Sequence, residues 1–116
     1  KSGSAVKEAL IEYTRSGGMT RGIYLKGADL QQIDLVNHHH QEGFDFSYAD
    51  FYRANLSGAH LFNINFNNTS LMKADLRYAN LNCAQVNNAN MLGIKWKACK
   101  IENLNFGKNS SKKLLV

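Results

Sequence analysis

The chain has 116 residues, no proline and a formal net charge of +5, and 44% of its residues are hydrophobic. This length gives one small core rather than two domains. No apolar run approaches the about eighteen residues that a membrane-spanning helix needs, and the N-terminus has no signal-peptide pattern. We therefore expect a single cytoplasmic domain. Because it begins at Lys1 instead of Met, we interpret it as a module of a longer protein.

The first predicted element is a short helix over residues 4–13. Four residues form its expected apolar face: Val6, Ala9, Leu10 and Tyr13. Ser4 is its expected N-cap, and the Gly17-Gly18 pair is expected to end it.

From Ile23 to Phe106 the sequence repeats every five residues. Each repeat has a large apolar residue at its centre and a small or apolar residue two positions earlier. The pairs are Ile23/Leu25, Ala28/Leu30, Ile33/Leu35, Phe44/Phe46, Ala49/Phe51, Ala54/Leu56, Ala59/Leu61, Ile64/Phe66, Thr69/Leu71, Ala74/Leu76, Ala79/Leu81, Ala84/Val86, Ala89/Met91, Ile94/Trp96, Cys99/Ile101 and Leu104/Phe106. The period fits neither an amphipathic helix nor an alternating strand, so it predicts a solenoid.

Several segments resemble the A-(D/N)-L-x-x motif of pentapeptide-repeat proteins: residues 27–30 (GADL), 48–51 (YADF), 53–56 (RANL), 73–76 (KADL) and 78–81 (YANL). The resemblance covers about three quarters of the chain. It implies an all-β fold, a right-handed quadrilateral parallel β-helix with four pentapeptides per coil. We expect about four coils over residues 22–108, a helical cap over 1–21 that covers the open end, and a polar, basic tail over 109–116.

In such a fold the centre and minus-two side chains point inward, and like residues stack one strand spacing apart, about 4.7–4.9 Å. One expected column contains Phe46, Phe66, Val86 and Phe106. Trp96 also occupies a centre position, so we expect it to be buried.

The repeat is interrupted between Leu35 and Phe46, which are eleven residues apart, two pentapeptides plus one residue. We assign the extra residue to a bulge at 36–43 that contains His38, His39 and His40. In this register His40 would stack on His60, and a zinc ion between their imidazoles is the alternative to the solvated loop that we favour.

Outward-facing residues give the predicted site. The position after each centre of the second face reads Gln31, Tyr52, Met72 and Leu92, and the last three form an apolar ribbon. Arg53 and Lys73 form a basic edge beside it. Because aligned exposed apolar residues indicate a contact surface, we expect the ribbon, this edge and the histidine bulge to bind a protein partner or a second copy of the chain. Packing beneath a terminal segment is the alternative.

Catalytic patterns are absent from the sequence: there is no Ser/His/Asp order, glycine-rich phosphate loop or CxxC pair. Asp29, Asp50 and Asp75 stand at the outward position before a centre, where the repeat explains them as turn residues. Cys83 and Cys99 are expected to be reduced thiols too far apart for a bridge. We therefore expect no enzyme activity, no cofactor and no bound metal.

The predicted function is that of a rigid protein-interaction scaffold. The resemblance offers an alternative, because some pentapeptide-repeat proteins protect DNA gyrase from fluoroquinolones with long acidic dimers. This chain is short and basic, and its charge changes along the repeat from −3 over residues 22–70 to +4 over residues 71–108. Nucleic-acid binding is a further alternative, disfavoured because Trp96 is expected to be buried and so unable to stack on a base.

Overall fold

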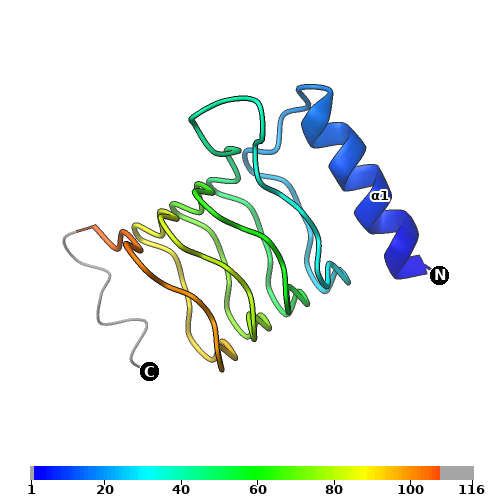
Figure 1. Ribbon diagram of the computed structural model, residues 1–116. Helices are drawn as coiled ribbons and strands as arrows, with labels where there is room; N and C mark the ends of the chain where they lie inside the picture. The colour runs from blue at the N-terminus through cyan, green and yellow to red at the C-terminus, as the bar shows by residue number, and fades with distance from the viewer. Residues whose placement is uncertain (1, 108–116) are drawn as a thin grey trace.

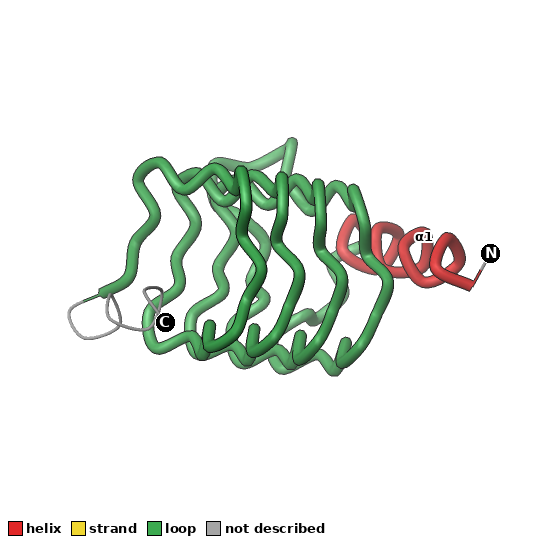
Figure 2. Tube along the Cα trace, turned by 90° about the horizontal axis from the view of Figure 1, so that it is seen from below, coloured by secondary structure: helices red, strands yellow, loops and turns green. Residues whose placement is uncertain are grey.

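The computed structural model describes residues 2–107, so the predicted tail at 109–116 lies outside the described residues. In this part of the chain one helix, α1 (Ser2–Arg15), is followed by successive coils that stack side by side. Figure 1 shows α1 lying against the first coil, and Figure 2 shows the coils in a row with α1 beyond one end and no segment coloured as strand.

Helix α1 packs on the first coil by a different stripe from the predicted one. Leu10 and Thr14 are buried, with Lys7 and Ile11 half-buried, whereas Val6, Ala9 and Tyr13 of the predicted face are exposed. The true stripe is shifted by one residue, since the aliphatic stem of Lys7 covers the coil while its Nζ donates to the Gln31 carbonyl at 3.0 Å. Ser4 lies inside α1, so its predicted capping role is wrong.

The coils are joined by parallel bridges that recur every five residues along the chain. Asp45 pairs with Asn65, Asn65 with Gln85 and Gln85 with Asn105, each a step of twenty residues. Backbone bonds flank every bridge: the Phe51 N–H, for example, donates to the Ser70 carbonyl at 2.7 Å. Within residues 2–107 these bridges stay isolated and form no continuous strand, because a turn follows each one. The structure thus has the parallel coiling of a β-helix without the extended strands that "all-β" implies.

The first coil is longer than predicted. Tyr24 pairs with Asp50 and Asp34 with His60, both steps of twenty-six residues. The insertion therefore amounts to six residues, one pentapeptide plus one, and the predicted single-residue bulge is wrong. Thr20, which is buried, supplies the first centre of this coil. Segment 36–43 then leaves the ladder altogether as a projecting loop (Figure 1).

Each corner of a coil is a turn closed by a bond from the next minus-two N–H to the centre carbonyl, as from Ala54 to Phe51 at 2.8 Å. The second residue after the centre has a positive φ, which is typical of a type II turn. Eleven non-glycine residues adopt this φ, between 57° and 66°: Gln32, Tyr48, Arg53, Asn63, Asn68, Lys73, Tyr78, Cys83, Asn88, Ala98 and Asn103. The ladder thus forces ordinary side chains into a strained backbone region.

The interior is a packed apolar shaft, as the sequence predicts. Phe46 and Phe66 stack with ring centroids 6.3 Å apart, and Phe51 lies 5.1 Å from Phe66. The prediction for Trp96 is wrong, since this side chain is 38% exposed. Trp96 belongs to the last described coil, where no described residue stacks on it.

Replacing Ala98 by glycine should stabilise the fold. Ala98 is exposed and has a φ of 58°, so glycine would relieve the strain on its backbone. We expect a gain of about 0.5–1 kcal/mol in the free energy of unfolding, measured by urea denaturation. The control Ala79→Gly, in the core, should lose a comparable amount, and a loss in both variants would contradict the argument.

Replacing Gly43 by alanine should destabilise the return of the loop. A Cβ there would overlap the Asn63 carbonyl, a backbone group that cannot move aside. Asn63 Nδ2 also donates to the Gln41 carbonyl at 2.7 Å and holds the same segment. We expect a loss of about 1–3 kcal/mol in the free energy of unfolding. Gly27→Ala adds a Cβ in open space and should lose only the cost of its positive φ, about 1 kcal/mol; a loss no larger than this in Gly43→Ala would show that close approach is not the cause.

Candidate functional site

The predicted apolar ribbon is a real column of side chains. Tyr52, Met72 and Leu92 follow the same centre in three successive coils, and their backbones are joined by bonds from Arg53 N to Met72 O at 3.0 Å and from Lys73 N to Leu92 O at 2.9 Å. Leu92 is 46% exposed, whereas Tyr52 and Met72 are half-buried. The ribbon is therefore a shallow apolar strip, more recessed at its N-terminal end.

The predicted first member of this column, Gln31, is wrong. The twenty-six-residue step places Lys26 there instead, with the Gly27 N–H donating to the Tyr52 carbonyl at 2.8 Å. Lys26 Nζ lies 5.4 Å from the centre of the Tyr52 ring, within range of a cation–π interaction. The strip thus begins with a cation stacked on an aromatic ring.

The predicted basic edge lies beside the strip. Arg53 and Lys73 are exposed at positive-φ corners. The Arg53 guanidinium lies 5.3 Å from the Tyr52 ring, and its Nε donates to the Tyr52 hydroxyl at 3.1 Å. This hydrogen bond chiefly lowers the pKa of the Tyr52 phenol; desolvation opposes it, and the positive charges of Arg53, Lys73 and Lys26 add to the lowering. Two cations thus lie within cation–π range of the Tyr52 ring.

Two further tyrosines were missed by the sequence analysis. Tyr24, 69% exposed, pairs with Asp50, and Tyr48, 54% exposed, stands two residues before it. The Arg21 guanidinium lies 4.4 Å from the Tyr48 ring and donates to Ser47 Oγ at 3.1 Å. Both positions face outward in the predicted pentads Ile23/Leu25 and Phe44/Phe46, so the sequence held this signal, whereas the pairing of Tyr24 with Asp50 follows from the step of twenty-six residues. The N-terminal part of this face therefore mixes aromatic rings with cations.

His38, His39 and His40 are exposed on the projecting loop. His60 pairs in the ladder with Asp34, so the predicted stacking of His40 on His60 is wrong. Among the residues with described side chains, no three of His, Cys, Asp and Glu are close enough to hold a metal ion. The loop leaves its coil after the fourth centre, whereas each ribbon residue follows the second centre of its coil. The loop and the ribbon therefore lie on different faces of the shaft, and the structure does not join these two predicted sites into one surface.

His38 is paired with a carboxylate. Its Nε2 lies 2.9 Å from Asp34 Oδ2, and the Val36 N–H donates to Asp34 Oδ1 at 3.0 Å. Desolvation raises the pKa of the Asp34 carboxyl, but the hydrogen bonds from His38 and Val36 and the nearby imidazoles outweigh it and lower that pKa. Asp34 therefore holds a negative charge at the base of the loop.

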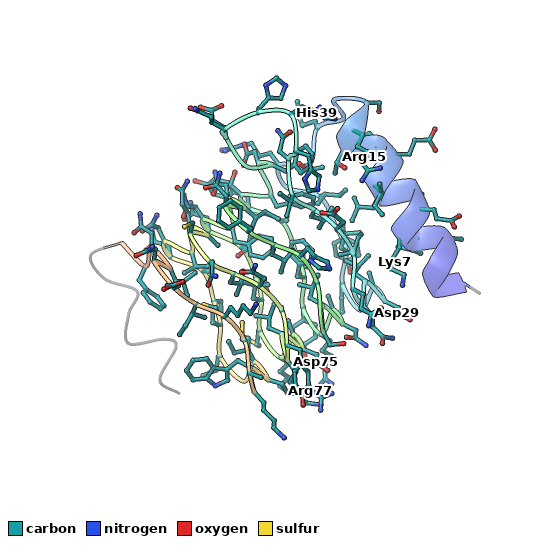
Figure 3. All side chains as sticks on the ribbon, viewed as in Figure 1. Lys7, Arg15, Asp29, His39, Asp75 and Arg77 are labelled. Carbon is teal, nitrogen blue, oxygen red and sulfur yellow. The ribbon has the colours of Figure 1, made fainter. Side chains whose placement is uncertain are left out.

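The other singled-out carboxylates serve the backbone. Asp50 Oδ1 accepts the Tyr52 N–H at 2.9 Å and Asp75 Oδ1 accepts the Arg77 N–H at 3.1 Å. Asp75 also forms an ion pair with Arg77 at 2.7 Å, and that hydrogen bond chiefly lowers the pKa of the Asp75 carboxyl. Figure 3 shows this pair at the edge of the shaft away from His39. These groups fix turns, as the sequence predicts.

The cysteines are free thiols. Cys83 lies at a positive-φ corner, and Cys99 is partly buried at a minus-two position. Burial raises the pKa of the Cys99 thiol to about 11, so this sulfur stays protonated and poorly nucleophilic at neutral pH.

Comparison with known proteins supports the repeat. The sequence profile of the pentapeptide repeats matches eight copies, over residues 42–63 and 54–91. Curated proteins give no match. No helix among the described residues is long and apolar enough to cross a membrane.

Three solved structures illustrate the likeness. HetL, a pentapeptide repeat protein involved in heterocyst differentiation regulation from the cyanobacterium Nostoc sp. strain PCC 7120, is 27% identical with a TM-score of 0.47; the alignment covers 72% of this chain and 47% of HetL. A pentapeptide repeat protein from the Arabidopsis thaliana thylakoid lumen is 26% identical with a TM-score of 0.28, covering 73% of this chain and 62% of that one. Rfr23, a pentapeptide repeat protein from the cyanobacterium Cyanothece 51142, is 20% identical with a TM-score of 0.29; the alignment covers 76% of this chain and 86% of Rfr23.

The chain thus spans about half the length of HetL. The profile matches the five-residue repeat that the ladder of bridges displays in this chain. The chain belongs to the pentapeptide-repeat family.

Proposed function

We propose that this chain is a non-enzymatic interaction scaffold whose coils hold the strip Lys26–Tyr52–Met72–Leu92 and its Arg53/Lys73 edge for a protein partner. The proposal includes the division into a cap at 1–21 and a right-handed, four-sided shaft of about four coils at 22–108, in a bacterial cytoplasmic protein. It is supported above all by one observation, the presence of both Lys26 and Arg53 within cation–π range of the Tyr52 ring at the head of an apolar column.

The chemistry of the strip indicates the partner. Met72 and Leu92 offer apolar contact, while Lys26, Arg53 and Lys73 offer positive charge along one side. A partner segment with apolar side chains beside carboxylates would satisfy both features, because charge complementarity steers and orients association. The ladder keeps these groups in place before binding, which lowers the entropic cost of association.

A second candidate function is single-stranded nucleic-acid binding at the other end of the shaft. Trp96 is exposed between the exposed Lys95 and Lys97, and Tyr78, 61% exposed, lies beneath Lys97 with its N–H donating to the Lys97 carbonyl at 3.0 Å. Aromatic rings that stack bases beside lysines that contact phosphates are typical of such sites. This exposure removes the objection that Trp96 is buried.

The alternative of DNA gyrase binding, as by a fluoroquinolone-resistance protein, gains no support comparable to the exposed Trp96. A likeness to QnrB1, a plasmid-mediated fluoroquinolone resistance protein, is found at 18% identity with a TM-score of 0.25. The charge of this chain is +5, opposite in sign to an acidic DNA-like surface.

The scaffold is tested with the triple variant Tyr52→Glu/Met72→Glu/Leu92→Glu in affinity capture from source-cell lysate. Negative charge on the strip should repel an acidic partner and remove apolar contact. We expect capture of the partner to weaken by at least about tenfold, equivalent to ~1.4 kcal/mol.

A matched control places the same charges on other faces: Gln31→Glu/Ser57→Glu/Phe62→Glu, each at the position after a centre. Circular dichroism should show that both variants keep the wild-type fold. If both triple variants lose the partner equally, the effect is one of net charge. If both retain the partner equally, the strip is not the binding site.

The nucleic-acid candidate is tested by fluorescence titration with a single-stranded oligonucleotide, since Trp96 is the only tryptophan. Stacking should quench its emission, and the affinity should fall with salt. Lys95→Gln/Lys97→Gln should reduce the slope of log affinity against log salt by about 1.4, roughly 0.7 per lost phosphate contact. An unquenched, salt-independent signal would refute this function.

A further inference from the structure

A cleft opens between the end of α1 and the projecting loop. Its walls come from three segments: the last residues of α1, the linker at 17–21 and the loop with its return at 36–45. Its volume is about 680 Å³, within the usual range for small-molecule sites. Figure 3 shows Arg15 and His39 at this same edge of the molecule. The cleft depends on the six-residue insertion and lies apart from the ribbon.

Positive groups dominate the walls. Arg15 comes from α1, Arg21 from the linker, and His38, His39 and His40 from the loop. Arg21 is fixed in place by its bond to Ser47 Oγ and by the Tyr48 ring beneath it, and it retains free N–H donors. Arginine forks bind phosphate oxygens with paired hydrogen bonds, so two of them facing three imidazoles form a cradle for anions.

Groups that would oppose an anion are already engaged. Asp45 Oδ1 accepts both the N–H and the hydroxyl of Ser47, and Asp34 pairs with His38. Two arginines against Asp45 leave a net charge of +1 on the lining. Asp34, which lies outside the lining, offsets any charge on His38, so only protonation of His39 and His40 would add to it.

The carbonyls that end α1 are also occupied. The Gly18 N–H donates to Tyr13 O at 2.8 Å, the Gly17 N–H to Thr14 O at 3.2 Å and the Ser16 N–H to Glu12 O at 3.0 Å. The negative end of the helix is therefore largely satisfied by its own turn, and Arg15 offsets what remains.

We propose that this cleft binds a small phosphate-bearing molecule of nucleotide size. Arg15, Arg21 and the loop histidines hold the phosphate oxygens, and the apolar part of the ligand lies against Met19, Val36 and Phe44, of which Met19 is 76% exposed. The site goes beyond the proposed partner-binding role and uses none of the strip residues.

The test uses the full chain, with NMR titration of backbone amides by ADP and by inorganic pyrophosphate at low salt. Both should shift the amides of residues 15–21 and 36–45. Arg15→Gln should weaken binding by about tenfold, because it removes a charged hydrogen-bond donor. Lys100→Gln, which removes the same charge from an exposed position of the last coil, should leave the affinity unchanged.

A pH series separates histidine binding from simple arginine attraction. Inorganic sulfate keeps its double negative charge across the range, so any change in its affinity comes from the protein. Between about pH 7.5 and about pH 5.5 imidazoles ordinarily gain protons, while Asp34, with its lowered pKa, stays ionised. Sulfate should bind several-fold more tightly at the lower pH in the wild type and show a smaller change in His39→Gln.

Three results would overturn the proposal: no amide shifts with either phosphate probe, shifts confined to the lysines of the last coil, or equal affinity in Arg15→Gln and Lys100→Gln. The strip variant should still bind ADP, and the cleft variants should still capture the protein partner. Failure of one site is thus distinguishable from failure of the other.

Discussion

The whole molecule depends on one repeated hydrogen-bond arrangement, in which each centre donates its N–H to the coil above and accepts from the corner that follows. The Phe51 carbonyl receives the Ala54 N–H, while the Phe51 N–H reaches Ser70. Five residues leave room for one bridge and one turn, so inward and outward positions are fixed by backbone geometry. The strain of positive φ at residues such as Tyr48 and Lys73 is the cost of closing each corner.

The insertion in the first coil decides which side chains meet on the surface. A step of twenty-six residues puts Lys26, rather than Gln31, against Tyr52, and gives Tyr24 and Arg21 their places on the cation-rich end of that face. The same six extra residues form the loop whose return presses Gly43 onto Asn63 and whose histidines complete the cleft. The six-residue insertion thus determines which side chains meet on both proposed surfaces of this chain.

The period and its inward columns could be predicted from the sequence, because an apolar centre every five residues has one way to be buried, as Phe46 and Phe66 show. The turn role of Asp50 followed from the same regularity. The insertion length could not be predicted, because eleven residues between Leu35 and Phe46 fit either one extra residue or six once Thr20 can serve as a centre. Nor could the stripe of α1 be predicted, where the stem of a lysine replaced an apolar residue.

The strip and the cleft are held by the same fold but lie on different surfaces of it. The strip rests on ladder bonds between successive coils, such as that from Arg53 N to Met72 O, whereas the cleft rests on α1, the linker and a loop tied down by Asn63. Arg21 links them, since it lines the cleft and stacks on Tyr48 at the head of the tyrosine-rich face. A ligand that drew the Arg21 guanidinium toward its phosphate would uncover the Tyr48 ring. The Arg21–Tyr48 pair is therefore the contact at which the cleft meets the tyrosine-rich face.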